Sequence, residues 1–220
     1  MSENIIILGA TGGCLDTIDL INEINQYHGN LSLNIVGLFD DNFKNLKKKI
    51  SGVPVIGSIS SIKNFKECKI VNALGSEKNF HKKRNLLIDE LKLNPKRFLT
   101  IIHPSVTIGH GVTIGNGCII YQNVSVGRNC ILGTNNIILP NSFIGHDTKV
   151  GGFTIINAGS MVSGSVIIGQ NCYLGSGTKI KPYCKIGNKV LTGIGSVVTN
   201  NLRSSKIYIG IPAKPIGKIN

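Results

Sequence analysis

The sequence places a histidine directly before a carboxylate at His146-Asp147. A histidine is suited to general-base chemistry because its pKa lies near neutral pH, and an adjacent carboxylate can orient the ring and raise its basicity. Such a pair can take the proton from a hydroxyl or an amine as that group attacks a carbonyl carbon. None of the other histidines, at positions 28, 81, 103 and 110, is followed by an acid. We therefore interpret His146 as a candidate base and Asp147 as its support.

A second candidate site is the glycine-rich turn Gly9-Ala10-Thr11-Gly12-Gly13 near the start of the chain. It follows an apolar run at 4–9, and aliphatic residues then recur at near-helical spacing, which predicts strand, turn and helix in succession. The glycine spacing departs from the dinucleotide-binding fingerprint. Asp40 and Asp41 end the next apolar run, where carboxylates can contact a ribose or a base. A nucleotide site and a solvated turn are both open interpretations of these residues.

The composition favours a folded protein with an excess of positive charge. Lys and Arg number 24 against 11 Asp and Glu, which gives a formal net charge of +13. This excess predicts solvated basic faces or a field that attracts anionic ligands, and no motif of nucleic-acid binding accompanies it. The six cysteines form no CxxC pair, and the chain shows neither a basic leader nor a long apolar segment. We expect reduced thiols, no membrane span and a cytoplasmic location.

The C-terminal half contains a repeat of six residues. An aliphatic residue occupies every sixth position, and four positions later stands a small or β-branched residue. A strict six-residue period does not fit the 3.6 residues of a helical turn, but it fits three short strands in a coil of about eighteen residues. We expect a left-handed β-helix whose aliphatic residues stack inward. The series is Ile102, Ile108, Ile114, Ile120, Val126, Leu132, Ile138, Ile144, Val150, Ile156, Val162, Ile168, Leu174, Ile180 and Ile186.

The narrow interior of such a coil leads to two further expectations. The second inward position should accept only small residues, and the four cysteines that fall there should be buried packing thiols. Glycine follows the aliphatic residue in many repeats, where we expect it to permit the backbone conformation of the corners. The cysteines are Cys118, Cys130, Cys172 and Cys184, and the glycines are Gly109, Gly115, Gly127, Gly133, Gly145, Gly151, Gly169, Gly175 and Gly187.

The N-terminal half alternates strand and helix patterns, which predicts a small parallel α/β domain. A helix is expected at 79–91. The chain should thus form a Rossmann-like α/β domain over 1–98, followed by an all-β left-handed parallel β-helix of hexapeptide repeats over 99–220. Beyond the first strand and helix, the expected strands are 34–39, 53–56 and 69–74.

Five short motifs mark the two halves: GATGG at 9–13, LFDD at 38–41, GVPVIGS at 52–58, IGHD at 144–147 and GIPAKPIG at 210–217. With the fused α/β and β-helix halves, they resemble the bacterial sugar O-/N-acyltransferases. That family includes the sialic acid O-acetyltransferase type and the nucleotide-aminosugar N-acetyltransferases. The resemblance spans nearly the whole chain. It implies acetyl-CoA as co-substrate, a nucleotide-sugar as substrate, and a homotrimer with CoA held between neighbouring prisms.

The resemblance also assigns roles to single residues. It implies that His146 is the general base, that Asp147 supports it, and that CoA is contacted largely through backbone. The family's glycine turn usually reads Gly-His-Gly, whereas this chain has Gly12-Gly13-Cys14 and lacks the histidine that contacts the substrate. The implied CoA contacts are Ile155, Ser176, Gly193, Ile194 and Lys214, and the implied substrate contacts are Thr11, Gly12, Gly13, Asp40, Asp41 and Gly75.

Three functions are compatible with these features. The leading prediction is acetyl-CoA-dependent N-acetylation of a nucleotide-linked amino sugar, such as a UDP-4-amino-sugar, in bacterial surface-glycan biosynthesis. O-acetylation of a sialic-acid-like sugar would use the same base. A non-catalytic trimeric binding protein is the third, and the His146-Asp147 pair argues against it. A thioester is already activated, so no metal is expected, and neither nucleic acid nor a membrane is an expected partner.

Overall fold

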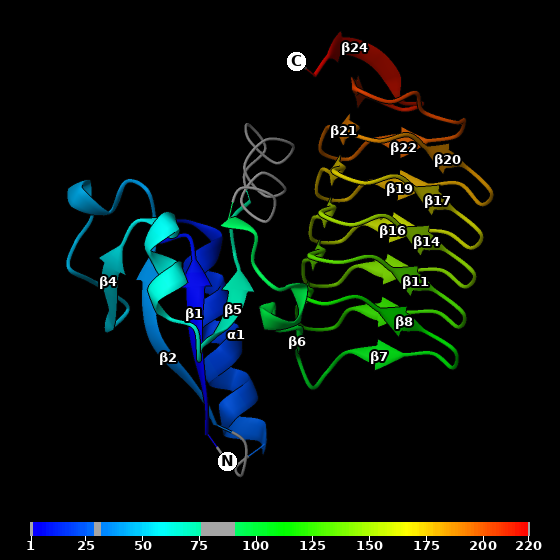
Figure 1. Ribbon diagram of the computed structural model, residues 1–220. Helices are drawn as coiled ribbons and strands as arrows, with labels where there is room; N and C mark the ends of the chain where they lie inside the picture. The colour runs from blue at the N-terminus through cyan, green and yellow to red at the C-terminus, as the bar shows by residue number, and fades with distance from the viewer. Residues whose placement is uncertain (1, 29–31, 76–90, 220) are drawn as a thin grey trace.

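A computed structural model describes residues 2–28, 32–75 and 91–219. The chain forms an N-terminal α/β unit that packs beside a three-sided stack of coils, which we call the prism (Figure 1). The coils succeed one another along the prism from β7 to the C-terminal strand β24 at the opposite end. The helix expected at 79–91 falls almost wholly outside the described residues.

The N-terminal unit is built on a five-stranded mixed sheet with the order β3-β4-β2-β1-β5. All neighbours pair in parallel except β3 and β4. Helix α1 (Gly13–His28) follows β1 directly, as the glycine turn predicted. The strands are β1 (Ser2–Leu8), β2 (Ser32–Phe39), β3 (Lys49–Ile50), β4 (Val53–Gly57) and β5 (Lys69–Asn72). Short 3-10 turns are η1 (Phe43–Asn45), η2 (Ile59–Asn64) and η3 (Pro95–Arg97).

The aliphatic run of β1 explains why this strand lies at the centre of the unit. Ile5 and Ile7 point to the face covered by α1, where they pack with Ile18. Ile6 points to the other face and packs with Phe39. All of these side chains are almost completely buried. A strand that is apolar on both faces is stable only where both are covered.

The prism is a parallel β-helix of two-residue strands arranged in three sheets. We call the sheet β6, β9, β12, β15, β18 and β21 the docked face, β7, β10, β13, β16, β19 and β22 the second face, and β8, β11, β14, β17 and β20 the third face. The bounds are β6 (Ile101–Ile102), β7 (Thr107–Ile108), β8 (Thr113–Ile114), β9 (Ile119–Ile120), β10 (Ser125–Val126), β11 (Ile131–Leu132), β12 (Ile137–Ile138), β13 (Phe143–Ile144), β14 (Lys149–Val150), β15 (Ile155–Ile156), β16 (Met161–Val162), β17 (Ile167–Ile168), β18 (Tyr173–Leu174), β19 (Lys179–Ile180), β20 (Lys185–Ile186), β21 (Leu191–Thr192) and β22 (Val197–Val198).

The six-residue series forms the interior of the prism, as predicted. Its members from Ile120 to Ile186 are nearly inaccessible to solvent and belong to one core cluster. Ile108 departs from this and stays 45% exposed, because it lies in the first coil and has no coil below it. At the C-terminal end, β23 (Lys206–Ile209) pairs with β21, and β24 (Lys214–Lys218) pairs antiparallel with β23.

The second inward position carries hydrogen bonds as well as small side chains. The four cysteines predicted to pack there are buried. The Cys130 thiol donates to the carbonyl of Gly145 at 3.1 Å, and the Thr148 hydroxyl donates to the carbonyl of Ser163 at 3.0 Å. Burial raises the pKa of the Cys172 thiol to about 12. The Cys172 thiol therefore remains protonated at neutral pH, and the hydrogen bonds at this position reinforce the coil corners.

The glycines that follow the aliphatic residues have a different role from the one expected. Positive φ occurs three residues after the aliphatic position and falls mostly on Asn or Gly, for example at Asn141 and Gly159. The predicted glycines are instead needed for close approach between coils. A Cβ on Gly133 would lie 2.6 Å from the amide nitrogen of Gly152 in the next coil. The stacking distance of the coils, and not the corner dihedral, selects glycine there.

The docked face joins the two units into one core. The outward residues Ile119, Ile137 and Ile155 of this face are buried, and they belong to the same apolar cluster as Ile18 and Ile21 of α1. Among the described residues, no helix has the length and apolar character needed to cross a bilayer.

We expect Gly133→Ala to lower the free energy of unfolding by about 1–3 kcal/mol, the usual cost of forcing extra volume into a packed interior. Gly159→Asn is the matched control. Gly159 has φ +67° with open space around its Cβ direction, and Asn141 occupies the equivalent corner one coil earlier. The control should change stability by less than about 0.5 kcal/mol, as surface changes usually do. Urea titrations measure the free energy of unfolding of both variants. Equal losses of stability in Gly133→Ala and Gly159→Asn would contradict the explanation that close approach between coils selects glycine at position 133.

Candidate functional site

The His146-Asp147 pair lies at the corner between β13 on the second face and β14 on the third face. His146 Nδ1 and Asp147 Oδ2 are 2.7 Å apart. The side chains are 61% and 50% exposed, respectively. The predicted partners are therefore hydrogen-bonded, and the pair stands on the outside of the prism.

Asp147 is held in place by its backbone and by both of its carboxylate oxygens. Its φ of 58° occupies the left-handed corner position that Asn129 fills in the preceding coil. The Asn129 amide donates to Asp147 Oδ1 at 3.1 Å. Hydrogen bonds from His146 and then from Asn129 lower the pKa of Asp147 below its usual value. An ionised Asp147 accepts a hydrogen bond from the N–H of Nδ1 in a neutral His146 ring. In this tautomer, Nε2 of His146 is the basic nitrogen.

Gly164 makes room for the imidazole ring and was not anticipated from the sequence. It lies in the next coil, and a Cβ there would be 2.7 Å from Nε2 and 2.8 Å from Cε1 of His146. Any side chain at 164 would displace the ring. The sequence does contain one indication of this role, because Gly164 lies eighteen residues, or one coil, after His146. This spacing can be interpreted only once the length of a coil is known.

The glycine turn lies at the carboxyl edge of the N-terminal sheet. Gly9 N–H donates to Phe39 O at 2.8 Å, and Ala10 N–H donates to Asp40 Oδ2 at 3.1 Å, which ties the ends of β1 and β2 together. The next three residues, 11–13, are exposed and lead into α1. Their amide groups donate to no other residue within the described ranges. Unpaired amides at a helix N-terminus form a suitable site for an anion.

The two aspartates after β2 hold local backbone structure. Asp40 also accepts from Asn42 N–H at 2.9 Å through Oδ1, and Asp41 Oδ1 accepts from Ile59 N–H at 3.1 Å. Both carboxylates thus have a role that needs no ligand. Cys14, the residue directly after the glycine turn, is buried. Burial and the charge of Asp40 raise the pKa of its thiol to about 12, so it stays neutral.

A cavity of about 200 Å³ lies between the glycine turn and the docked face. Gly75 follows β5 at its rim, and a Cβ there would be 3.0 Å from Ile155 Cδ1. The structure thus brings Gly13 and Gly75 together and places the side chain of Ile155 against them. The lining residues are Gly13, Asp16, Thr17, Ala73, Gly75, Tyr121, Ile137, Leu139, Ile155, Asn157 and Tyr173.

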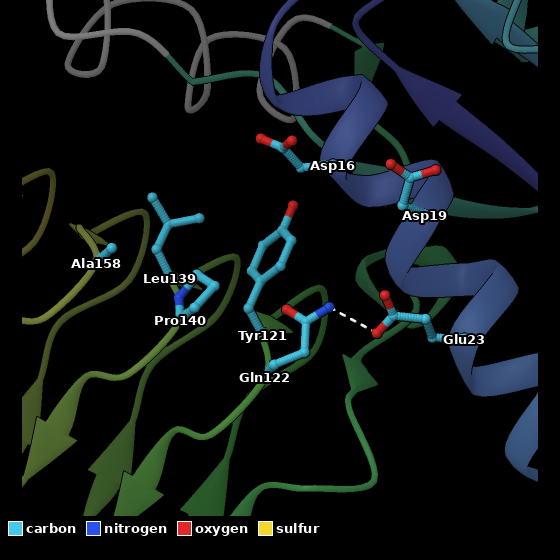
Figure 2. A pocket seen from close by; sticks show the side chains of 8 residues that line it. All are labelled: Asp16, Asp19, Glu23, Tyr121, Gln122, Leu139, Pro140 and Ala158. Atoms are coloured by element: carbon cyan, nitrogen blue, oxygen red, sulfur yellow. Dashed lines mark hydrogen bonds between the residues drawn. The ribbon is translucent and has the colours of Figure 1, made fainter.

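A larger cavity of about 420 Å³ adjoins it, between α1 and the corner that joins the docked and second faces. Figure 2 shows three carboxylates of α1 on one side and residues of three successive corners on the other. The two cavities share Asp16, Tyr121 and Leu139. The lining residues are Asp16, Asp19, Glu23, Tyr121, Gln122, Leu139, Pro140 and Ala158.

The implied CoA contacts are more scattered than the implied substrate contacts. The side chain of Ile155 is buried between the units, whereas Ser176, Ile194 and Lys214 are exposed. Gly195 N–H donates to the carbonyl of Ser176 at 2.8 Å, so Ser176 and residues 193–194 lie on successive coils at one corner. Ile155 lines the smaller cavity, whereas the other implied CoA contacts and His146 line neither cavity. Within the described part of the chain, no group of three His, Cys, Asp or Glu side chains could hold a metal ion.

Two family descriptions match parts of the sequence. Residues 4–85 match the PglD N-terminal domain, and residues 147–182 match the bacterial transferase hexapeptide family of six repeats. The first match lies in the N-terminal part of the chain, and the second lies in the prism. No curated protein matches the sequence.

Solved structures share the fold over nearly the full chain. Perosamine N-acetyltransferase from Caulobacter crescentus, a histidine mutant in complex with CoA and GDP-perosamine, has a TM-score of 0.83 at 22% identity, covering 98% of this chain and 97% of that one. The acetyltransferase domain of PglB from Neisseria gonorrhoeae with acetyl coenzyme A has 0.83 at 22%, covering 98% and 100%. WeeI from Acinetobacter baumannii has 0.80 at 21%, covering 98% and 100%. The TM-scores establish a common fold, and at these identities the likeness shows the fold alone.

The contacts around Asp147 predict how its pKa responds to substitution. Asn129→Gly removes one donor but retains a corner residue suited to positive φ, as Gly111 does one coil earlier. The pKa of Asp147 should rise toward 3.8, and it should rise further in His146→Ala, since the histidine is the larger cause of the lowering. Carboxyl ¹³C shifts followed against pH report both values. Asn141→Gly is the control and should leave the pKa of Asp147 unchanged. An unchanged pKa of Asp147 in His146→Ala would contradict the hydrogen bond between His146 and Asp147 as the main cause of the lowering.

Proposed function

We propose that the protein is an acetyl-CoA-dependent N-acetyltransferase acting on a nucleotide-linked amino sugar, with His146 as its general base. The observation that carries the proposal is the hydrogen-bonded His146-Asp147 pair, exposed on a corner of the prism with Nδ1 facing the carboxylate. The CoA and amino-sugar complexes solved for proteins of the same fold support it.

The proposed chemistry needs a proton acceptor for the attacking amine. An acceptor that binds as an ammonium group first loses one proton to solvent, which frees the lone pair of the nitrogen. Nε2 of His146 then takes a second proton from this amine nitrogen as the nitrogen forms a bond to the thioester carbonyl carbon. The carbon–sulfur bond then breaks, and the protonated ring returns the proton to the departing CoA sulfur. The carboxylate of Asp147 stabilises the imidazolium while it carries the proton. Since the thioester is already activated, the residues present suffice for the reaction.

The nucleotide part of the substrate is proposed to bind at the glycine turn. We infer that residues 1–98 form a Rossmann-like domain and residues 99–220 a left-handed β-helix domain. In the order β4-β2-β1-β5, all strands run parallel, but β2 and β4 are added on one side of β1 and β5 on the other. Ligands of such sheets bind beyond the carboxyl ends of the strands, at the point where the strand order switches sides. Thr11, Gly12 and Gly13 flank it on one side and Gly75 on the other. The amides of 11–13 suit a diphosphate, and Asp41 suits the ribose or base.

The larger cavity supports an amine as the acceptor. It adjoins the smaller cavity at the glycine turn, so a sugar linked to a diphosphate there would extend into it. Asp16, Asp19 and Glu23 place carboxylates on its wall, although the protein as a whole is strongly basic. Carboxylates attract an ammonium group over a neutral hydroxyl. This favours N-acetylation over O-acetylation of a sialic-acid-like sugar.

The proposed site requires more than one copy of the chain. His146 lies at the corner between the second and third faces, whereas the larger cavity lies at the corner between the docked and second faces. Corners of one rigid coil cannot meet. We propose a homotrimer in which His146 of one copy faces the cavity of another. CoA would lie between the prisms, near Ser176, Gly193, Ile194, Lys214 and the backbone of Ile155.

His146→Ala should lower kcat by about 10²- to 10⁴-fold, the usual loss on removing a general base. His110→Ala is the matched control, since His110 lies at the same corner two coils earlier and is not followed by an acid. CoA release from acetyl-CoA is followed with UDP- and GDP-linked 4-amino sugars and with free sialic acids. Turnover of a sialic acid alone would replace the N-acetyl proposal, and full activity of His146→Ala would reject the base.

A mixing experiment tests whether the site is shared between copies. His146→Ala removes the base, and Ala158→Trp fills the larger cavity, so each variant alone should be inactive. Assemblies formed by refolding the two together at equal amounts should regain about a quarter of the wild-type activity, since one site in four then combines an intact base with an open cavity. If base and cavity act within one chain, the mixture stays inactive.

A further inference from the structure

Tyr121 forms a buried link between the prism and the glycine turn. Its side chain projects from the corner after β9 toward α1, and only 4% of the residue is exposed (Figure 2). Its hydroxyl lies 2.8 Å from Thr17 Oγ1, in a contact that joins residues 104 positions apart. Thr17 is fully buried, and its hydroxyl donates to the carbonyl of Gly13 at 2.7 Å.

The direction of the two hydrogen bonds follows from counting protons. A threonine hydroxyl has one proton, and Thr17 gives it to Gly13 O. The Tyr121 hydroxyl must therefore be the donor to Thr17 Oγ1. Burial, with the nearby charge of Asp16, raises the pKa of Tyr121 to about 12. Tyr121 thus keeps its proton at neutral and alkaline pH, and the chain from Tyr121 through Thr17 to Gly13 has a fixed polarity.

The series of hydrogen bonds from Tyr121 through Thr17 ends at Gly13, the last residue of the proposed diphosphate site. Gly13 lies where the turn becomes α1, and the turn is otherwise closed by Cys14 N–H to Thr11 O at 3.2 Å and Leu15 N–H to Gly12 O at 2.9 Å. Glycines at 12 and 13 leave the turn without side chains that could fix its shape, and a Cβ on either would meet nothing within 4 Å. The hydrogen bond from Thr17 to Gly13 O therefore adds a side-chain constraint to the two backbone hydrogen bonds of the turn.

A second contact docks α1 without touching the turn. Glu23 Oε2 accepts from Gln122 Nε2 at 2.7 Å and lies 3.0 Å from His103 Nε2. Ser105 N–H donates to His103 Nδ1 at 3.0 Å, which leaves the proton of a neutral ring on Nε2, toward Glu23. Glu23 lies six residues beyond Thr17 along the helix. Loss of this contact loosens the docking but leaves the link to Gly13 intact, which provides a control.

We propose that Tyr121 is a positioning residue for the nucleotide-sugar, which holds the amides of residues 11–13 through Thr17 and sets their place relative to the larger cavity. The proposal rests on the proposed function for the identity of the ligand. The contact itself is independent of that identity. Tyr121 touches neither the thioester nor the base, so its effect should appear in binding of one substrate and not in the chemical step.

Tyr121→Phe removes the donor and retains the ring. Amide hydrogen exchange at Cys14 and Leu15, whose N–H groups close the turn, should become about three- to tenfold faster, the ratio expected for one net hydrogen bond. KM for the amino-sugar nucleotide should rise by a similar factor, while KM for acetyl-CoA and kcat stay unchanged. Thr17→Val should have the same effects on exchange and on KM. The double variant should show no larger change than either single variant, because each of the three proteins loses the same series of hydrogen bonds.

His103→Ala is the control for loosened docking, and it should leave exchange at Cys14 and Leu15 at the wild-type rate. Equal acceleration in His103→Ala and Tyr121→Phe would overturn the proposal in favour of general loosening, as would additive effects of Tyr121→Phe and Thr17→Val. Wild-type exchange in Tyr121→Phe would also overturn it. If exchange responds as expected but no amino-sugar nucleotide is turned over, the positioning contact stands and the proposed function fails.

Discussion

The interaction on which the structure depends is the backbone hydrogen bonding between successive coils. Around His146, Gly127 N–H donates to Ile144 O at 2.7 Å, Asp147 N–H donates to Arg128 O at 2.9 Å, and Ser165 N–H donates to His146 O at 2.8 Å. Each corner is therefore fixed by the coil before it and the coil after it. Parallel two-residue strands have no stability alone, so a coil exists only as part of the stack. The site inherits its rigidity from this arrangement.

The same constraint explains where side chains are missing. Coils that bond through their backbones leave no space for a Cβ at the glycine after each aliphatic residue, as Gly133 shows. At Gly164 the space is used differently, because the ring of His146 fills it. A small residue above and a carboxylate beside the ring define its orientation without any contact from the N-terminal unit. The prism can thus present His146 in the same way whatever substrate the other unit binds.

The sequence predicted what a repeat or a local pattern encodes, and it missed contacts between residues that are separated along the chain. Fifteen aliphatic positions at a period of six define the prism, and the burial of Ile144 and its equivalents confirms them. The glycine turn and α1 were predicted from local pattern. The role of Gly164 and the Tyr121–Thr17 contact could not be read in advance, since the first needs the coil length and the second joins positions 104 apart. Asp40 was expected to meet a ligand, yet its oxygens already bind backbone amides.

The exposure of the His146-Asp147 pair is the strongest reason to place the proposed site between copies of the chain. An imidazole that is 61% exposed beside a carboxylate that is 50% exposed acts in a medium close to water. Fixed charges and dipoles stabilise a developing charge far better where water is excluded. Nothing in the rigid prism can close over this corner, because each coil is bonded to its neighbours. In the proposed trimer, a second copy would supply the wall that excludes water, and the acidic cavity beside α1 offers a wall of opposite charge to an ammonium group.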